Sequence, residues 1–229
     1  MFKTAIVTGA SSGIGKAIAL KLAKEGINVV LAARNEAKLI ELETSINEEK
    51  HGKAHYIVTD VTKRDEVEHM VETAKAQFGA IDYLINNAGV MLNAVVTEGK
   101  VEDWEKMIDT NIKGVLYGTN AVLPHMLKRK SGHIINVASV SGFEVSKKST
   151  VYSATKFAVR AISTGLEKEL AHTGVRVTNI SPGMVDTNLT TRANLSRKPL
   201  ESSDIANAVY YAMTQPPYVN VNEITVRPI

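Results

Sequence analysis

The sequence predicts an α/β fold in which a parallel sheet of about seven strands carries helices on both of its faces. Short apolar runs rich in β-branched residues alternate with longer segments of helical periodicity along the 229 residues of the chain. Strands that alternate with helices are typical of parallel crossover units. Runs that are apolar almost throughout, such as Ile134-Ile135-Asn136-Val137-Ala138, are typical of strands buried on both faces.

This alternation also assigns the elements in order. The predicted strands are Thr4–Val7, Asn28–Ala32, His55–Thr59, Tyr83–Asn86, His133–Ala138, Arg176–Ile180 and Glu223–Val226. The predicted helices are Ile14–Lys24, Glu36–Glu48, Arg64–Phe78, Val101–Lys128, Tyr152–Ala171 and Asp204–Thr214. Thr62, with Asp65 and Glu66 after it, is typical of a helix N-cap with acids in the first turn. Gly26 and Gly79 are typical of residues that follow a helix end.

The composition limits the class of protein. The net charge of +3 comes from lysines and arginines scattered among acids, so we expect no nucleic-acid partner. The apolar start of the chain breaks from Gly9 to Gly13, unlike a signal peptide, and no run of about 18 apolar residues predicts a membrane span. The absence of cysteine excludes disulfides and thiolate metal sites, and we predict no metal. These features favour a cytoplasmic protein. No repeat or linker divides the chain, which predicts a single domain over residues 1–229.

The turn after the first predicted strand is rich in glycine. It reads Thr8-Gly9-Ala10-Ser11-Ser12-Gly13-Ile14-Gly15 and leads directly into a helix. Glycines in a strand-to-helix turn let a pyrophosphate approach the backbone, where amide groups and the positive helix N-terminus meet its charge. Such a turn at the start of an alternating α/β pattern predicts a Rossmann-type nucleotide-binding fold.

The end of the second predicted strand distinguishes NADP from NAD. An acidic residue there would bind the ribose 2′-hydroxyl of NAD. The sequence is instead Ala32-Ala33-Arg34-Asn35, in which Arg34 can bind a 2′-phosphate through charge-assisted hydrogen bonds. Arg34 can also be an ordinary solvated residue at a helix start, but the missing acid favours NADP(H).

Polar residues follow two further predicted strands. Asp60 can accept a hydrogen bond from an adenine amino group, or it can shape the turn before Thr62. The segment Asn86-Asn87-Ala88-Gly89 can hold the nicotinamide-side ribose, or it can bind neighbouring loops together.

Tyr152 and Lys156 predict the chemical centre. Positions four apart share a helix face, and an ammonium beside a phenol lowers the pKa of the phenol. Lowering that pKa from about 10 to about 7 takes roughly 4 kcal/mol, which Lys156 and a cationic nicotinamide can supply together. Tyr152 would then be a general acid or base. A tyrosine and lysine at this spacing are, on their own, more often a surface pair.

Two further residues strengthen the interpretation. Ser139 follows a predicted strand and can donate to a substrate oxygen beside Tyr152. Asn111 lies inside a predicted helix, where asparagine suits a local bend that holds a water near Lys156. Its alternative is an ordinary polar helix position.

Together these motifs resemble the short-chain dehydrogenase/reductase family, in its compact single-domain branch. The matching residues, in the family's order from about residue 4 to 190, are Thr8-Gly9-x-x-x-Gly13-x-Gly15, Asp60, Asn86-Asn87-Ala88-Gly89, Asn111, Ser139, Tyr152-x-x-x-Lys156, Pro182-Gly183 and Thr187. The resemblance implies a catalytic tetrad of Asn111, Ser139, Tyr152 and Lys156. It implies cofactor contacts from Gly9, Ser11, Ser12, Gly13, Ile14, Gly15, Arg34, Asp60, Val61, Asn87, Ala88, Gly89, Tyr152, Lys156, Pro182, Gly183, Val185 and Thr187. Many NADP-dependent members carry a second basic residue where this chain has Ser12.

The resemblance also bears on substrate and assembly. The segment from Gln215 to Pro228 resembles NADP-dependent 3-hydroxy acid and serine dehydrogenases, which implies a hydride transfer to or from a small 3-hydroxy acid or ketone. The alternatives are a 3-ketoacyl-carrier-protein reductase-like enzyme, whose usual final Gly-Gly is absent, and a non-catalytic NADP-binding sensor. The polar, basic segment 185–200 is a candidate substrate lid. Arg192 and Arg197 in this segment can meet a carboxylate, but two arginines in a polar loop are more often ordinary solvated charges. The family often forms homotetramers through its two long helices and last strand. Ala158, Ala161 and Ile162 would permit close packing there, or they are ordinary core positions.

Overall fold

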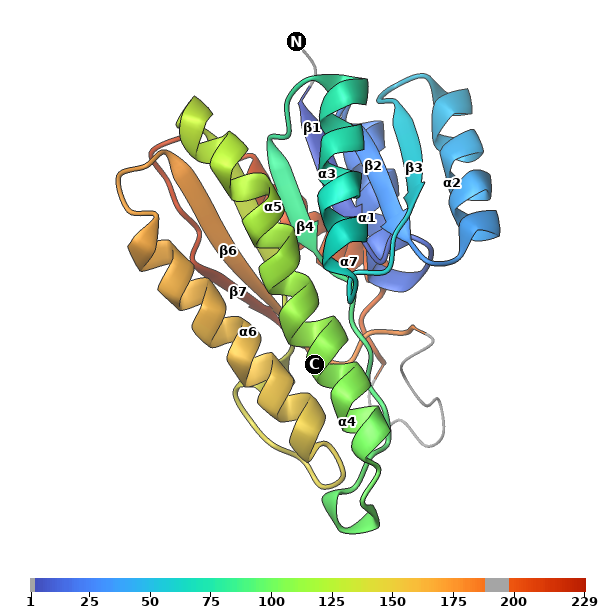
Figure 1. The fold of residues 1–229 in the computed structure, drawn as a ribbon, viewed down its shortest axis with the longest axis vertical. Coiled ribbons are helices and arrows are strands. Elements are labelled where there is room, and N and C mark those ends of the chain that lie inside the picture. The colour runs from blue at the N-terminus through green and yellow to red at the C-terminus, as the bar shows by residue number, and fades with distance from the viewer. Residues whose placement is uncertain (1–2, 188–197) are drawn as a thin grey trace.

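The chain forms a seven-stranded parallel sheet with the strand order β3-β2-β1-β4-β5-β6-β7 (Figure 1). The computed structural model describes residues 3–187 and 198–229. The strands are β1 (Thr4–Thr8), β2 (Asn28–Ala33), β3 (Ala54–Val58), β4 (Tyr83–Asn86), β5 (Gly132–Val137), β6 (Val175–Pro182) and β7 (Glu223–Val226). The fold class predicted from the sequence is therefore confirmed, and each strand end lies within two residues of its predicted position.

Helices cover both faces of the sheet. The α-helices are α1 (Gly13–Lys24), α2 (Glu36–Glu49), α3 (Arg64–Phe78), α4 (Val101–Ile108), α5 (Gly114–Arg129), α6 (Thr150–Glu169) and α7 (Ser202–Met213). Short turns of other helix types are η1 (Val96–Glu98), η2 (Asp109–Lys113) and η3 (Val140–Gly142). One face packs against α1, α2 and α7, through side chains such as Ile18, Leu39 and Val209. The other face packs against α3 and α5, through Val67 and Val122 (Figure 1).

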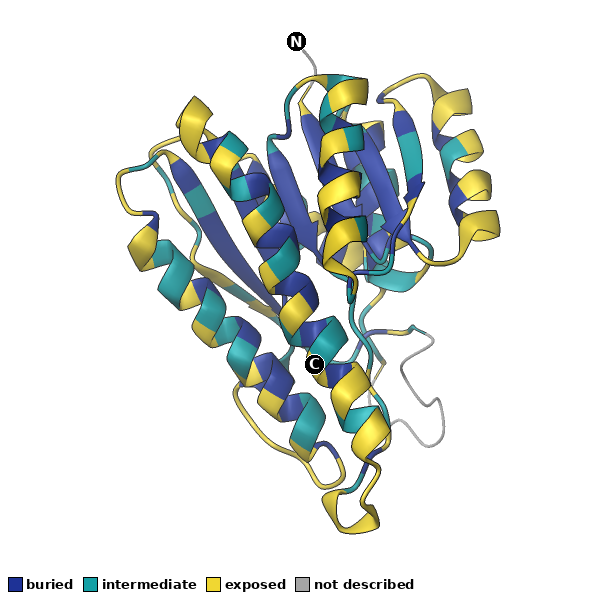
Figure 2. Ribbon diagram, viewed as in Figure 1, coloured by how far each residue is buried: buried dark blue, intermediate teal, exposed yellow. Residues whose placement is uncertain are grey.

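The central strands are buried on both faces, as their apolar sequences predict (Figure 2). Along β1, Ala5 and Val7 belong to the core under α1, whereas Ile6 belongs to the core under α3 and α5. This alternation follows from the strand geometry, in which successive side chains point to opposite faces. The result is two apolar layers that fix the sheet between the helices.

The strand order reverses direction beside β1, which pairs with β2 on one side and β4 on the other. The chain runs from β1 out to β3 and then returns to start β4. Loops that leave β1 and β4 therefore diverge and open a crevice at the carboxyl ends of these strands, which is where open α/β sheets bind ligands.

Two local predictions were wrong in detail. The predicted helix Val101–Lys128 is interrupted by a π-helical segment, η2, that separates α4 from α5. Thr62 does not cap α3, because the N-cap position is Lys63 and the Thr62 hydroxyl donates to Asp60 instead, at 2.8 Å. Gly79 does follow the end of α3, at a φ of 82°.

Most of the segment 185–200 lies outside the described residues, including Arg192 and Arg197. Its two ends form an isolated parallel bridge between Val185 and Leu200. Over residues 3–187 and 198–229, no helix combines the length and apolar character that crossing a membrane requires.

Candidate active site

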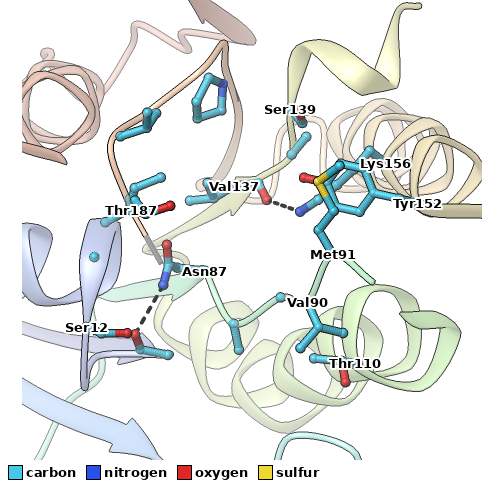
Figure 3. A pocket seen from close by; sticks show the side chains of 18 of the residues that line it. Ser12, Asn87, Val90, Met91, Thr110, Val137, Ser139, Tyr152, Lys156 and Thr187 are labelled. Atoms are coloured by element: carbon cyan, nitrogen blue, oxygen red, sulfur yellow. Dashed lines mark hydrogen bonds between the residues drawn. The ribbon is translucent and has the colours of Figure 1, made fainter. Parts of the chain in front are cut away.

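A cavity of about 800 Å³ opens at the carboxyl ends of the strands. Figure 3 shows Ser12, Asn87 and Thr187 on one side of it and Ser139, Tyr152 and Lys156 on the other. With two exceptions, every predicted site residue lines this cavity. The exceptions are Gly15 and Asn111. Segments far apart in the sequence therefore meet in one place, as the parallel sheet requires.

The glycine turn forms one wall of the cavity. Gly9 has a φ of +67°, and a Cβ atom there would lie 2.9 Å from Asn87 Nδ2 and 3.0 Å from the Ala88 backbone. Both facts require glycine at this position. Gly15 lies behind the wall, where any side chain would collide with the carbonyl of Gly9. The absence of a side chain at Gly15 thus allows α1 to pack closely against the turn.

Thr8 and Asn87 hold the two sides of the crevice together. The Thr8 hydroxyl accepts hydrogen bonds from the backbone nitrogens of Asn87 and Ala88, both at 3.0 Å. In return, the Asn87 amide donates to the Thr8 carbonyl at 2.9 Å. Of the two roles predicted for this segment, the bonding between loops is present in the structure. Asn86 instead points into the layer under α5, where its amide donates to Asn136 at 2.9 Å.

Arg34 and Asp60 lie at the end of the cavity formed by β2 and β3. Arg34 is exposed directly after β2, and the neighbouring Asn35 caps α2 by accepting from the Lys38 backbone nitrogen. The Asp60 carboxylate accepts from the backbone nitrogen and hydroxyl of Thr62, at 3.0 and 2.8 Å. Asp60 therefore shapes the turn, as one prediction held, and also lines the cavity.

Ser139 and Tyr152 come from neighbouring elements at the other end of the cavity. Ser139 follows β5 and caps η3, since its hydroxyl accepts from the Ser141 backbone nitrogen at 3.1 Å. Tyr152 lies in the first turn of α6. Both side chains line the cavity, and the Ser139 hydroxyl acts to lower the pKa of the Tyr152 phenol. The predicted pairing of a serine with a phenol at one site is therefore present.

Lys156 is one turn further along α6 and is buried. Its ammonium donates to the Val137 carbonyl at 3.0 Å and lies 5.8 Å from the centre of the Tyr152 ring. Burial lowers the pKa of Lys156 from 10.5 to about 8. The cause is the loss of hydration of the charged form in an apolar environment.

The expected lowering of the Tyr152 pKa is not found in the protein alone. Burial raises the pKa of the Tyr152 phenol, and the Ser139 hydroxyl only partly opposes this effect. The Lys156 ammonium lies over the ring and bonds to a backbone carbonyl, so in the protein alone it does not offset the burial. The charge of a bound cofactor remains the second contribution that the prediction invoked.

Asn111 lies behind the cavity wall, in the π-helical segment η2. Its amide oxygen accepts from the Val90 backbone nitrogen at 2.8 Å, and its amide nitrogen donates to the Val90 carbonyl at 2.9 Å. The same nitrogen donates to the Thr155 hydroxyl at 3.0 Å. The helix is irregular at Asn111, where the prediction placed a local bend, and the side chain fastens the loop after β4 to α6.

Several cavity residues carry no signal that the sequence reasoning used. Ser141 and Ser146 add hydroxyl groups to the cavity lining, while Met91, Val140 and Met184 add apolar surface. Their only common signal is proximity in the chain to Ser139, Gly89 or Gly183. Other lining residues absent from the predicted set are Ala33, Asn35, Thr59, Val90, Thr110, Val137 and Ala138. Within the described ranges, no three histidine, aspartate or glutamate side chains gather in a way that could hold a metal ion.

Comparison with known proteins agrees with this geometry. A model of the short chain dehydrogenase family matches residues 3–198. An uncharacterized oxidoreductase of Staphylococcus saprophyticus is 58% identical over 228 residues, which are 99% of this chain and 97% of the relative.

Two solved structures are similar over nearly the whole chain. One is the closed form of a serine dehydrogenase complexed with NADP+, with 36% identity, a TM-score of 0.89 and coverage of 97% and 94% of the two chains. The other is an alcohol dehydrogenase from the archaeon Thermococcus sibiricus complexed with 5-hydroxy-NADP, with 29% identity, a TM-score of 0.92 and coverage of 100% and 97%. By its family match and its relatives, the chain belongs to the short chain dehydrogenase family and is an oxidoreductase enzyme.

Proposed function

We propose that the protein is an NADP(H)-dependent dehydrogenase that transfers a hydride between nicotinamide and a small hydroxy or keto compound. The observation that carries this proposal is the single cavity that holds both the glycine turn and the Ser139-Tyr152-Lys156 group. A nucleotide bound along the turn would extend towards these three side chains. The reacting carbon of the substrate would then lie between the nicotinamide and Tyr152.

The donor groups of the cavity suit a dinucleotide. The Ser12 side chain makes no capping bond to α1, so the first amide groups of the helix are available to a pyrophosphate. Arg34 would bind the 2′-phosphate at the far end of the cavity. The similar solved structures contain NADP+ or 5-hydroxy-NADP, which supports NADP(H) over NAD(H).

The chemistry follows from the side chains at the other end. The cofactor supplies or accepts the hydride when bound. Tyr152 would donate a proton to the substrate oxygen in reduction and remove it in oxidation. Ser139 would donate a hydrogen bond to the same oxygen as charge develops on it. Lys156 would favour the phenolate form of Tyr152 by its charge, and Asn111 would hold the loop and helix that frame the centre.

Support for a small substrate comes from the similarity to a serine dehydrogenase and from the cavity wall. Ser141 and Ser146 offer hydroxyl groups for a polar substrate, whereas Met91 and Met184 confine the space beside them. We therefore place a 3-hydroxy acid or a simple ketone ahead of a long acyl chain. We also propose a homotetramer formed through α4, α5, α6 and β7. Ala161 is exposed for such a contact, but Ile162 packs partly against the cluster of Val115, Ala138 and Val159.

The test is a titration with NADPH and NADH, followed by assays with 3-hydroxy acids, simple ketones and ketoacyl thioesters. Wild type is compared with Tyr152→Phe, which removes only the phenol oxygen. We expect turnover with NADPH that falls about 100- to 10,000-fold in the variant while NADPH binding persists. Tight NADPH binding without Tyr152-dependent turnover on any substrate would favour a sensor. Preference for the ketoacyl thioesters would show that the substrate is an acyl chain and not a small compound. Light scattering of the same sample measures the molar mass in solution, which tests the homotetramer.

A further inference from the structure

Arg160 connects three elements around the candidate active site. Its Nη1 donates to the Gly142 carbonyl at 2.9 Å, and its Nε and Nη2 donate to the two oxygens of Glu223, both at 3.1 Å. Its guanidinium also stacks over the Phe143 ring, 3.5 Å from the ring centre. One planar side chain of α6 is thus fixed to β7 and to the turn that begins at Ser139. Arginine suits this arrangement because its fork of donors has a rigid geometry.

Glu223 gives Arg160 a fixed anchor. Its Oε1 accepts from the Asn179 amide at 2.9 Å and from the Ser181 hydroxyl at 3.1 Å. Asn179 and Glu223 are register partners in β6 and β7. Burial tends to raise the pKa of Glu223, but the bonds and charge of Arg160 and the neighbouring donors outweigh it and lower the pKa. The carboxylate is therefore held charged against the sheet.

Gly142 brings the turn into direct contact with α6. A Cβ atom at Gly142 would lie 2.8 Å from Arg160 Cδ and 2.8 Å from the Lys156 carbonyl oxygen. The turn η3 is therefore seated on the helix at the level of Lys156, beneath the Arg160 side chain. Ser139 begins this turn and Lys156 lies one helical turn before Arg160. The position of the turn on the helix sets the position of Ser139 relative to Tyr152.

We propose that Arg160 is a positioning residue, which holds the turn 139–142 on α6 so that Ser139 keeps its place relative to Tyr152 in the cavity. This inference rests on the proposed function, in which Ser139 and Tyr152 share the substrate oxygen. Arg160 itself does not line the cavity and touches no reacting atom. Its effect on the reaction passes through the Gly142 carbonyl and the Phe143 ring.

The chain offers a matched control. Arg129 donates to the Ile81 carbonyl at 2.9 Å and to the Asp82 carboxylate at 2.8 Å, at the opposite ends of the strands. Each arginine thus joins a backbone carbonyl to a carboxylate, but only Arg160 adjoins the Ser139 turn. Lysine at either position keeps the charge but cannot make both contacts through a planar fork.

The experiment compares Arg160→Lys and Arg129→Lys, with Glu223→Gln as a second change at the same anchor. For Arg160→Lys we expect kcat to fall about 10- to 100-fold, because small displacements of catalytic groups have effects of this size. KM and NADPH affinity should stay near wild type. Glu223→Gln should show a smaller fall of the same kind, and Arg129→Lys should keep the wild-type kcat even where it lowers the melting temperature.

The pH profile separates positioning from general weakening. Ser139 lowers the pKa of Tyr152, so its displacement should move the profile of alcohol oxidation to higher pH in Arg160→Lys. Lys156, the charged neighbour of Tyr152 on α6, is unchanged in all three variants. A wild-type kcat and pH profile in Arg160→Lys would overturn the inference. Equal losses in both arginine variants would reduce Arg160 to a structural role. A wild type without Tyr152-dependent turnover would instead defeat the proposed function, and the inference with it.

Discussion

The Lys156 ammonium lies 5.8 Å from the centre of the Tyr152 ring and donates to the Val137 carbonyl at 3.0 Å. The ammonium is thus buried next to the sheet and bonds to one backbone carbonyl. Within residues 3–187 and 198–229, it forms no ion pair with a carboxylate. A buried charge without a counter-ion opposes folding. Under the proposed function, Lys156 serves the reaction at the expense of stability.

Lys156→Met should therefore produce a more stable but inactive protein. The decrease of the Lys156 pKa from 10.5 to about 8 corresponds to roughly 3 kcal/mol against the folded state, from which the lost hydrogen bond to Val137 subtracts about 1 kcal/mol. We expect a net gain of about 2 kcal/mol in the free energy of unfolding at pH 7.

The gain of Lys156→Met should depend on pH in a defined way. Below pH 8 the lysine is charged in both folded and unfolded chains, so the full cost is present. As pH rises from 8 towards 10.5, the folded protein releases the proton first and the advantage of methionine shrinks. Urea unfolding at pH 7 and 9.5 measures the difference in the free energy of unfolding between Lys156→Met and wild type. Lys168→Met, at an exposed position of α6, is the control. A variant less stable than wild type at pH 7 would contradict the prediction.

The hydrogen bonds of Asn111 to Val90 and Thr155 provide a second prediction. Asn111→Asp keeps the shape and still accepts from the Val90 nitrogen, but it cannot donate to the Val90 carbonyl or the Thr155 hydroxyl. The change also buries a carboxylate, and the Lys156 ammonium on the other side of Gly89 offsets only part of that cost. We expect a loss of about 2 to 4 kcal/mol in the free energy of unfolding, measured by urea titration at pH 7. The control is Asn120→Asp on the exposed face of α5, and equal small losses in both variants would refute the role of these bonds.

The fold could be predicted because hydrophobic alternation sets the class and order of the elements. The carboxyl ends of parallel strands share one edge of the sheet. Residues that follow these ends must therefore lie along the same edge, as Gly9, Arg34, Asp60 and Ser139 do. The first and last residues of helices were harder to predict, since they depend on individual hydrogen bonds of the capping side chains. Thr62 has the composition of a cap, but its hydroxyl bonds to Asp60 and the helix begins one residue later than a Thr62 cap requires.

The part of the site that could not be predicted depends on tertiary contacts. The amide of Asn111 reaches Val90, which is 21 positions away, and no local pattern specifies that pair. The raised pKa of Tyr152 likewise depends on burial, which its spacing from Lys156 does not reveal. The role inferred for Arg160 requires Gly142 and Glu223 to be neighbours in space.

Arg34 leads to a prediction on cofactor choice. Arg34→Ala should weaken NADPH binding about 10- to 100-fold, because hydrogen bonds to a charged group contribute about 1.5 to 3 kcal/mol. NADH lacks the 2′-phosphate, so its affinity should not change. Fluorescence titrations with both nucleotides measure the two dissociation constants. Lys38→Ala, an exposed cation one turn further along, is the control. An equal loss of affinity for NADPH and NADH would show that Arg34 does not bind the 2′-phosphate.

His133, which lies near the amino end of β5, leads to a prediction on the stability of the protein in acid. It is 1% exposed, its Nε2 lies 2.7 Å from the Thr178 hydroxyl, and its Nδ1 is buried without a partner among the described residues. Because Thr178 donates its own proton to the Val221 carbonyl, His133 must donate through Nε2. Burial, with smaller effects from the charges of Arg176 and Lys3, lowers the pKa of His133 from 6.5 to about 3.

The sign of the pH effect follows from this difference. Above pH 6.5 the histidine is neutral in both folded and unfolded chains, so it adds no pH dependence. Between pH 6.5 and 3 the unfolded chain binds a proton that the folded protein excludes, and His133 should cost about 1.4 kcal/mol of stability per pH unit. His133→Gln, which can still donate to Thr178, should remove about 2 kcal/mol of the stability lost between pH 7.5 and 5. The exposed His51→Gln should leave that loss unchanged. Urea unfolding at the two pH values measures both, and an unaltered loss in His133→Gln would mean that His133 takes up its proton without unfolding.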